Sequence, residues 1–277
     1  MERNHTNAGL VRVSENMLNR LISSHICKGK LEMFLQPQVN ILTGKIIGIE
    51  LLVRWVNHLG KSIEPHFFLP LIRNSKYKAK FSQWVLEEAF RVSEALCIEG
   101  FNVRVACNLD ASEMYSGIEF FLHKLRKEYP KAGEVEIEVT EVGHLSDRKN
   151  LEAYIECFKK HGIKVALDDF GTGLNNFDAV FNYDIDKVKT DKKFLNLNVE
   201  VREAFFSSIC SITEKLGLDL VVEGIETTSE LIALQELGVT TVQGFYISKP
   251  IPFKDFVSSH KNSLGIINEE NIANCNS

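Results

Sequence analysis

Short apolar runs rich in β-branched residues recur along the chain and alternate with longer amphipathic segments. The runs have the length and composition of buried strands. They are Met33–Pro37, Ile46–Glu50, Val103–Asn108, Val135–Thr140, Ile163–Asp169, Ile185–Thr190, Leu218–Glu223 and Thr241–Phe245. Helical spacing predicts helices over Ser14–Ile26 (capped by Ser14), Pro65–Ile72, Phe81–Ile98, Ser112–Glu128, Leu151–His161, Leu174–Phe181, Val199–Leu216 and Ser229–Leu237. Such alternation indicates a largely parallel sheet.

Polar residues at the strand ends distinguish between the two folds that fit this alternation, an open doubly wound sheet and a closed eight-stranded barrel. An open sheet collects ligands mainly at one switch point, whereas a barrel brings the carboxyl ends of its parallel strands to one mouth. Nearly every run ends in or near a chemically capable residue: Gln36, Glu50, Asn108, Glu138, Asp168 with Asp169, Lys189, Glu223 and Gln243. This pattern favours an α/β fold, a TIM-like (β/α)8 barrel. Because only Gln38–Lys45 separates the first two runs, they are expected to form an antiparallel hairpin.

The composition is that of a globular protein, with 277 residues, 44% hydrophobic and 25% charged. A net charge of −5 gives no positive field for duplex nucleic acid. Neither an apolar stretch of the roughly 18 residues needed for a membrane span nor a signal-peptide core is found. We therefore expect a cytoplasmic protein without a membrane partner. One barrel domain is expected over residues 15–258, between an N-terminal tail (1–14) and a polar C-terminal tail (259–277).

The carboxylates among these strand-end residues suggest a metal-dependent reaction. If Glu50, Glu138, Asp168, Asp169 and Glu223 converge, each contact at about 4 Å costs about 4 kcal/mol at the effective dielectric of a protein surface, so protonation or cations must compensate. Oxygen donors without His or Cys favour Mg²⁺ or Mn²⁺, and the adjacent Asp168 and Asp169 allow one carboxylate to bridge two ions. Two such ions suit in-line displacement at phosphorus. Phosphodiester hydrolysis is the resulting hypothesis.

Each of these residues also has an ordinary explanation when taken alone. A single Glu or Gln at a strand end is more often a surface or salt-bridged residue, and Asp168-Asp169 before Phe170–Gly173 also fits a tight turn that caps a helix. Lys189 fits a solvated or ion-paired lysine, or the Schiff-base nucleophile of an aldolase. Neighbouring carboxylates oppose that nucleophile by favouring the charged ammonium. The joint occurrence at successive strand ends favours a metal site.

Eight segments in order resemble the EAL-domain phosphodiesterases of bacterial cyclic di-GMP signalling. They are Phe34–Pro37, Glu50–Trp55, Asn108-Leu109, Glu138–Glu141, Asp168–Gly173, Val188–Asp191, Val222–Thr227 and Gln243–Phe245. The resemblance covers roughly residues 15 to 258. It implies a barrel with one antiparallel strand, which hydrolyses cyclic di-GMP to linear pGpG with two Mg²⁺ or Mn²⁺ ions, and a homodimer as a further expectation.

The resemblance also implies roles for single residues. Glu50, Asn108, Glu138 and Asp168 would hold one ion, and Asp168 with Asp169 would hold or bridge the second. Lys189 and Glu223, together with Glu50, would be catalytic and would position and activate water. Gln36, Arg54 and Gln243 would bind the substrate or its water shell, while Glu141 and Glu226 would brace the loop after Asp169.

The chain departs from the family pattern at a few positions. Leu51 replaces the usual Ala, Asp110 replaces the usual Ser, and Leu174–Phe177 replaces Tyr-Ser-Ser-Leu in the loop that the family uses for dimer contact. None of these changes removes an expected ligand. The alternative within the family is a catalytically silent cyclic di-GMP receptor or protein-interaction module, and such relatives usually lack several ligands.

Overall fold

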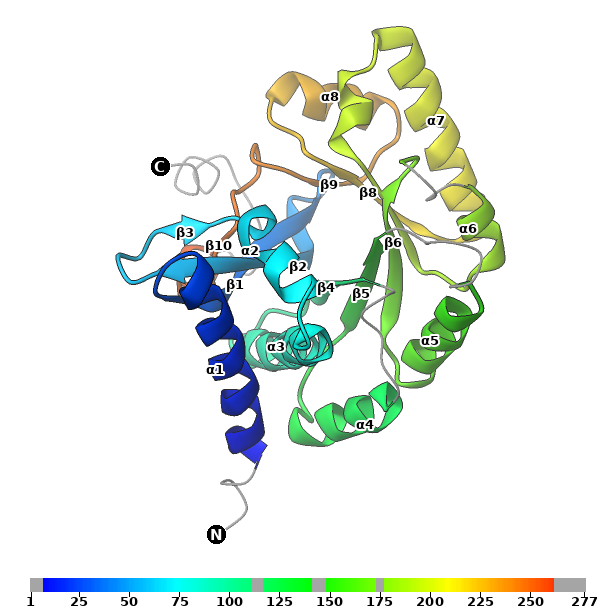
Figure 1. Ribbon diagram of the computed structural model, residues 1–277. Coiled ribbons are helices and arrows are strands. Elements are labelled where there is room, and N and C mark those ends of the chain that lie inside the picture. The colour runs from blue at the N-terminus through cyan, green and yellow to red at the C-terminus, as the bar shows by residue number, and fades with distance from the viewer. Residues whose placement is uncertain (1–6, 111–116, 141–147, 173–176, 262–277) are drawn as a thin grey trace.

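Eight strands close into a barrel in the computed structural model, which describes residues 7–110, 117–140, 148–172 and 177–261 (Figure 1). The barrel strands are β1 (Gly29–Asn40), β2 (Lys45–Asn57), β4 (Arg104–Asp110), β5 (Val135–Thr140), β6 (Lys164–Phe170), β7 (Lys187–Thr190), β8 (Asp219–Glu223) and β9 (Thr241–Gln243). Neighbouring strands are parallel from β2 and β4 round to β9. β1 closes the barrel antiparallel to both β2 and β9. The predicted TIM-like barrel and its hairpin are confirmed.

Two short strands extend this sheet and were missed by the sequence pattern. β3 (Ser62–Ile63) pairs with the end of β2, and β10 (Ile251–Pro252) pairs with β1, both antiparallel. Each has only two residues, which is too short to show an alternating pattern.

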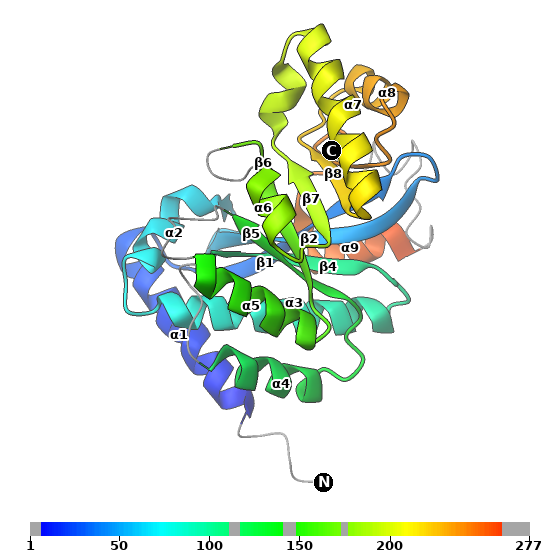
Figure 2. The ribbon, with the colours of Figure 1, turned by 90° about the vertical axis from the view of Figure 1, so that its right-hand side faces the viewer.

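Helices surround the barrel, as the two perpendicular views show (Figures 1 and 2). They are α1 (Asn7–His25), α2 (Pro65–Arg73), α3 (Lys78–Ile98), α4 (Ile118–Glu128), α5 (Arg148–Lys160), α6 (Phe177–Asn182), α7 (Val199–Leu216), α8 (Thr228–Glu236) and α9 (Phe253–His260), with a 3-10 turn over Lys192–Asn196. α1 begins at Asn7, inside the segment assigned to a tail, so the predicted cap at Ser14 is wrong. A serine only weakly disfavours a helix interior, and the helix continues through it. The short α9 was not predicted.

The helix between β7 and β8 shows how local sequence sets the element boundaries. The Asn198 side chain accepts a hydrogen bond from the Val201 amide at 3.0 Å and begins α7. Gly217, with φ of 68°, ends it in the left-handed conformation that glycine adopts without a steric cost. α7 therefore has the predicted limits. No helix among the described residues is long and apolar enough to cross a membrane.

The two faces of each strand have different chemistry. Residues such as Val105, Ile137 and Val188 belong to the buried hydrophobic core. The residues that alternate with them include Glu136, Glu138, Lys187 and Lys189, which are also buried. Successive residues of a strand point to opposite faces, so the barrel interior carries the polar set while the opposite face packs under the helices. This charged interior positions the site.

Candidate active site

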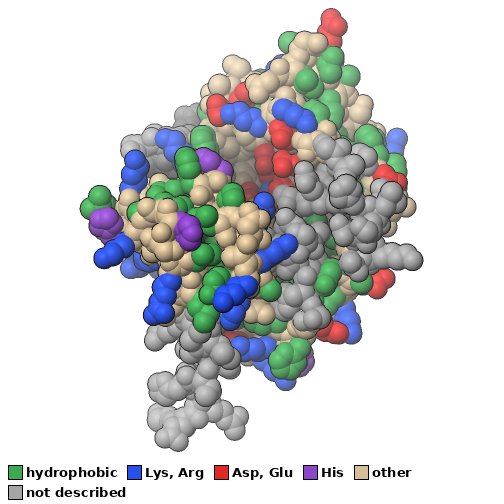
Figure 3. All heavy atoms as spheres, in the orientation of Figure 1, with side chains coloured by type: hydrophobic (Ala, Val, Ile, Leu, Met, Phe, Trp, Pro, Cys, Tyr) green, Lys and Arg blue, Asp and Glu red, His purple; other side chains and the backbone are tan. Residues whose placement is uncertain are grey.

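Three pairs of predicted site residues stand directly opposite one another on neighbouring strands. The pairs are Gln36 with Glu50, Asn108 with Glu138, and Glu223 with Gln243. The side chains share the interior face at the carboxyl ends of the parallel strands. Figure 3 shows acidic side chains gathered in the central hollow of the face onto which these ends open.

Lys189 lies at the centre of this group. Its Nζ is 2.6 Å from Glu223 Oε1 and 2.8 Å from Glu138 Oε2. The same nitrogen is 3.4 Å from both Glu50 Oε2 and Asp168 Oδ1. The side chain is completely buried. The structure therefore brings together four predicted carboxylates around one ammonium, although their strands are far apart in the sequence.

Glu50 is fixed by two amides. Asn108 Nδ2 donates to Glu50 Oε1 at 2.7 Å, and Gln243 Nε2 donates to Glu50 Oε2 at 2.5 Å. Burial by itself raises the pKa of Glu50, but Lys189 and the two amide hydrogen bonds outweigh it and hold the pKa below its ordinary value. Glu50 is therefore a positioned carboxylate anion.

The other acids are short of positive charge. Burial and the charge of Glu50 raise the pKa of Glu138 well above its ordinary value, against the influence of Lys189. Burial also raises the pKa of Glu223 to about 8, although Lys189 opposes the shift. One ammonium does not neutralise four carboxylates, which is the physical reason that this site attracts further cations or protons.

Burial does not make Lys189 a neutral amine. Burial alone lowers the pKa of Lys189, but Asp168 and the three glutamates raise it well above its ordinary value. The side chain therefore keeps its proton at neutral pH. A Schiff-base aldolase needs a neutral amine, so the electrostatics argue against that alternative.

The end of β6 is irregular at the paired aspartates. The pairing with β7 shifts between Leu167 and Phe170, and Asp169 has a φ of 51°. A bulge of this kind redirects side chains near active sites. Burial and the neighbouring Asp168 raise the pKa of Asp169 to about 6. Consecutive side chains of a regular strand point to opposite faces, so this local bend allows Asp169 to lie near Asp168 and Lys189 at the mouth of the barrel.

Gln36 and Gln243 form a hydrogen-bonded chain beside Glu50. Gln243 Nε2 lies 3.1 Å from Gln36 Oε1, and Gln36 Nε2 donates to the Ser248 carbonyl at 3.0 Å. A cavity of about 200 Å³ adjoins them, lined by Glu223 and Phe245 among others. Its walls therefore combine one aromatic ring with amide, acidic and basic groups.

The remaining predicted residues lie around this centre. Arg54 follows Glu50 by four residues on the same strand face, and its Nη1 donates to the Val53 carbonyl at 2.9 Å. Glu226 forms an ion pair with Lys192 after β7, so its predicted role toward the loop after Asp169 stays a prediction. Glu141 and residues 174–176 lie outside the described residues.

The donor chemistry fits a hard divalent cation. Glu138 Oε2 and Glu223 Oε1 are occupied by the Lys189 ammonium. Glu138 Oε1 and Gln243 Oε1 are buried and have no hydrogen-bond partner among the described residues, so these two oxygens have lone pairs to offer an ion. In the part of the chain that the structure describes, no three His, Cys, Asp or Glu side chains are already grouped around a cation position. The Lys189 ammonium lies among the carboxylates instead.

Comparison with known proteins places this geometry in a family. The sequence model of the EAL domain matches residues 16–250. The chain belongs to the EAL domain family. As an EAL protein it is similar to the cyclic di-GMP phosphodiesterase RocR of Pseudomonas aeruginosa, with 28% identity over 234 residues that cover 83% of this chain. It is also 25% identical over 247 residues, or 86% of the chain, to the oxygen sensor protein DosP of Escherichia coli K12.

Solved structures of the family agree with the fold. The PaMucR phosphodiesterase in complex with c-di-GMP superimposes with a TM-score of 0.75 and 26% identity, and the match covers 89% of this chain and 98% of that one. The curated relatives are longer, since the chain spans 59% of RocR and 30% of DosP.

A second polar layer beneath the site was not predicted. It contains Gln38, Glu136 and Lys187, each two residues before or after a predicted site residue on the same strand. Lys187 Nζ lies 2.6 Å from Glu136 Oε1 and donates to Gln38 Oε1 at 3.0 Å. The two-residue period that places Gln36, Glu138 and Lys189 inside the barrel is the sequence signal that identifies this layer.

Proposed function

We propose that this EAL protein hydrolyses cyclic di-GMP to linear pGpG with Mg²⁺ or Mn²⁺. The observation that carries the proposal is the buried Lys189 ammonium inside a ring of four carboxylates, to which Asn108 and Gln243 add amide groups. Family membership and the likeness to phosphodiesterases such as RocR support the substrate.

The residues that would hold the ions are Glu50, Asn108, Glu138, Asp168 and Asp169. When bound, such ions supply hydroxide near neutral pH and offset negative charge at the phosphoryl group. Asn108 and Gln243 hold Glu50 in one orientation, so little reorganisation is needed at that carboxylate.

Lys189 keeps its proton and would donate hydrogen bonds that orient the attacking hydroxide or offset charge on a phosphoryl oxygen. Glu223, in contact with Lys189, would orient the same water. Gln36 and Gln243 present amides, and Arg54 a cation, toward the phosphates and guanine of the substrate. The expected homodimer and cytoplasmic location stay predictions.

A hydrolysis assay tests the function. Purified protein with Mg²⁺ or Mn²⁺ is incubated with cyclic di-GMP, and pGpG is followed by chromatography. Glu50→Ala and Asp168→Ala are expected to abolish turnover, whereas Glu236→Ala, on the exposed end of α8, leaves it unchanged. Robust turnover by either site variant contradicts the site assignment. Tight binding of cyclic di-GMP without product at any metal concentration instead supports the silent receptor.

A further inference from the structure

The aromatic ring of Phe194 lies against the turn that follows the paired aspartates. Phe194 belongs to the 3-10 turn Lys192–Asn196 after β7, and Gly171 directly follows β6. A Cβ at Gly171 would lie 2.5 Å from Cζ and 3.0 Å from Cε2 of the Phe194 ring. Non-bonded carbon atoms keep about 3.5–4 Å apart, so the edge of the ring occupies the space that a side chain at Gly171 would need.

The turn in contact with the ring determines where Asp169 points. The amide and the hydroxyl of Thr172 both donate to the Asp169 carbonyl oxygen, at 3.1 and 2.7 Å. Asp169 has a φ of 51° and Gly171 a φ of 84°. A left-handed backbone costs free energy in a residue other than glycine, and it persists where the surroundings enforce it. The contacts that hold this turn therefore also orient the Asp169 carboxylate.

Two further contacts hold the same turn. The Phe170 side chain is 2% exposed, and its ring packs edge-on against Phe177 with the ring centroids 5.1 Å apart. Lys193 Nζ lies 3.4 Å from the Gly171 carbonyl oxygen and 5.0 Å from the centre of the Phe194 ring. Phe170 thus fixes the beginning of the turn in the core, and Phe194 fixes its middle.

The ring of Phe194 is itself fixed by α7. It stacks on Phe205 with the centroids 4.0 Å apart and the planes 3° from parallel, and Phe205 meets Phe206 edge-on at 5.1 Å. Phe206 is completely buried. The Asp191 carboxylate accepts a hydrogen bond from the Lys193 amide and begins the 3-10 turn that carries the ring. The ring therefore cannot move away from the turn after β6 without disturbing packed neighbours.

From this arrangement we infer that Phe194 is a positioning residue: its ring, stacked on Phe205, keeps the turn after β6 closed and holds Asp169 in the orientation that binds a divalent ion. Phe194 acts through the backbone of Gly171 and not on the reacting groups. Removal of a group that orients a metal ligand commonly lowers metal affinity or activity about 10- to 100-fold. The inference rests on the proposed function, because it assigns Asp169 to an ion.

Phe194→Leu removes the ring and keeps an apolar side chain. Three quantities are measured on the full chain: amide hydrogen exchange at Thr172 by NMR without metal, Mn²⁺ affinity by calorimetry, and turnover of cyclic di-GMP against Mn²⁺ concentration. We expect exchange at Thr172 to become about tenfold faster or more, and Mn²⁺ affinity to fall about tenfold or more. The Mn²⁺ concentration for half-maximal turnover should rise accordingly, while KM for cyclic di-GMP at saturating Mn²⁺ stays within about twofold.

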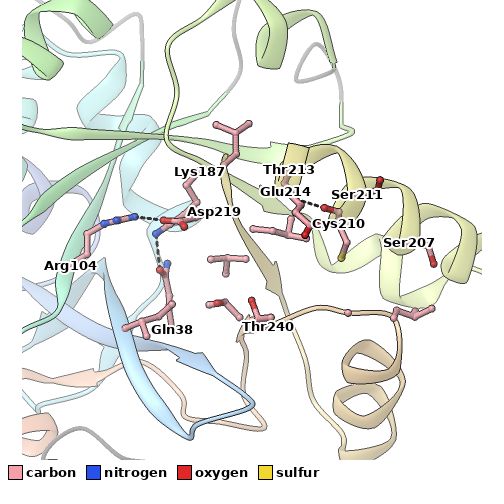
Figure 4. A pocket seen from close by; sticks show the side chains of 17 residues that line it. Gln38, Arg104, Lys187, Ser207, Cys210, Ser211, Thr213, Glu214, Asp219 and Thr240 are labelled. Atoms are coloured by element: carbon pink, nitrogen blue, oxygen red, sulfur yellow. Dashed lines mark hydrogen bonds and ion pairs between the residues drawn. The ribbon is translucent and has the colours of Figure 1, made fainter. Parts of the chain in front are cut away.

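Two control variants leave the contact with Gly171 intact. Phe121→Leu makes the same change to a partly buried ring on α4. Ser211→Ala changes α7 at a residue that lines a cavity of about 640 Å³ at the other end of the barrel (Figure 4). Both variants should keep the wild-type exchange at Thr172 and the wild-type Mn²⁺ affinity. If Phe194→Leu does not fold, Phe205→Leu removes the stacked partner and should shift both quantities in the same direction.

The outcomes separate this inference from the proposed hydrolysis. Wild-type exchange at Thr172 or wild-type Mn²⁺ affinity in Phe194→Leu overturns the inference, even if turnover falls. A wild-type protein that binds Mn²⁺ without turnover refutes the hydrolysis instead, and the other two measurements then decide the role of Phe194. A wild-type protein that binds no Mn²⁺ overturns both proposals.

Discussion

Lys189 and Glu223 meet across the neighbouring strands β7 and β8, with the ammonium nitrogen 2.6 Å from the nearer carboxylate oxygen. Three further carboxylates lie within 3.4 Å of the same nitrogen. A single buried cation thus stabilises a group of acids that would otherwise repel one another.

Lys189→Met is expected to lower kcat for cyclic di-GMP by about 10²- to 10³-fold, since it removes a preorganised donor from the site. The measurement is pGpG formation at saturating substrate. Lys215→Met, at the exposed end of α7, serves as the control and should retain full activity. Activity of Lys189→Met within a factor of about two of the wild type would contradict the assigned role.

Mn²⁺ is expected to stabilise the protein, because the ion binds the folded carboxylate group and not the unfolded chain. At about 100 times the dissociation constant this amounts to about 2.7 kcal/mol, a rise in Tm of about 5–10 °C. Differential scanning calorimetry with and without Mn²⁺ measures the shift. Glu138→Gln should lose most of it, whereas Asp255→Asn on α9 should keep it. An equal shift in the two variants would place the ion elsewhere.

Removal of the divalent ions with EDTA should abolish turnover of cyclic di-GMP.

The free energy of unfolding should fall as pH rises from about 4.5 to about 7, because of the titration of Glu87. Burial and the nearby Glu128 raise the pKa of Glu87 to about 7. In this pH window the folded state keeps a proton that the unfolded state loses, so rising pH favours unfolding.

Glu87→Gln is therefore expected to gain about 1–2 kcal/mol at pH 8 and little at pH 4. Urea unfolding at both pH values measures the difference. The exposed Glu152→Gln on α5 is the control and should change neither value. A gain that is equal at pH 4 and pH 8 would show that titration of Glu87 is not its cause.

Gly244→Ala should destabilise the protein by about 3 kcal/mol or more, because a Cβ there would lie 2.2 Å from the Ile225 carbonyl oxygen. The movement of the backbone that relieves this overlap is also expected to displace the adjacent Gln243 from Glu50. Gly217→Ala meets no atom within 4 Å and has only its φ of 68° against it, so about 1 kcal/mol is expected. Denaturant unfolding of both variants gives the comparison, and equal losses would refute the steric explanation.

The sequence by itself determined the local elements and the chemistry that they carry. The short apolar runs rich in β-branched residues predicted all eight barrel strands, and the short Gln38–Lys45 connection predicted the antiparallel hairpin. Residues such as Glu50, Glu138 and Lys189 were identified from their places at strand ends. These features follow from side-chain alternation and turn length, which act over a few residues and are therefore visible in one stretch of sequence.

Only the tertiary structure decided which of these side chains touch. That Lys189 lies within 3.4 Å of four carboxylates, and that Lys187 donates to the side-chain oxygen of Gln38, depends on closure of the barrel and on strand register. Closure of the barrel brings β1 beside β9. As a result Gln36 and Gln243 form a hydrogen bond although they are more than 200 residues apart in the sequence. The physical reason is that register between distant strands is set by simultaneous packing of the whole sheet, and no local pattern encodes it.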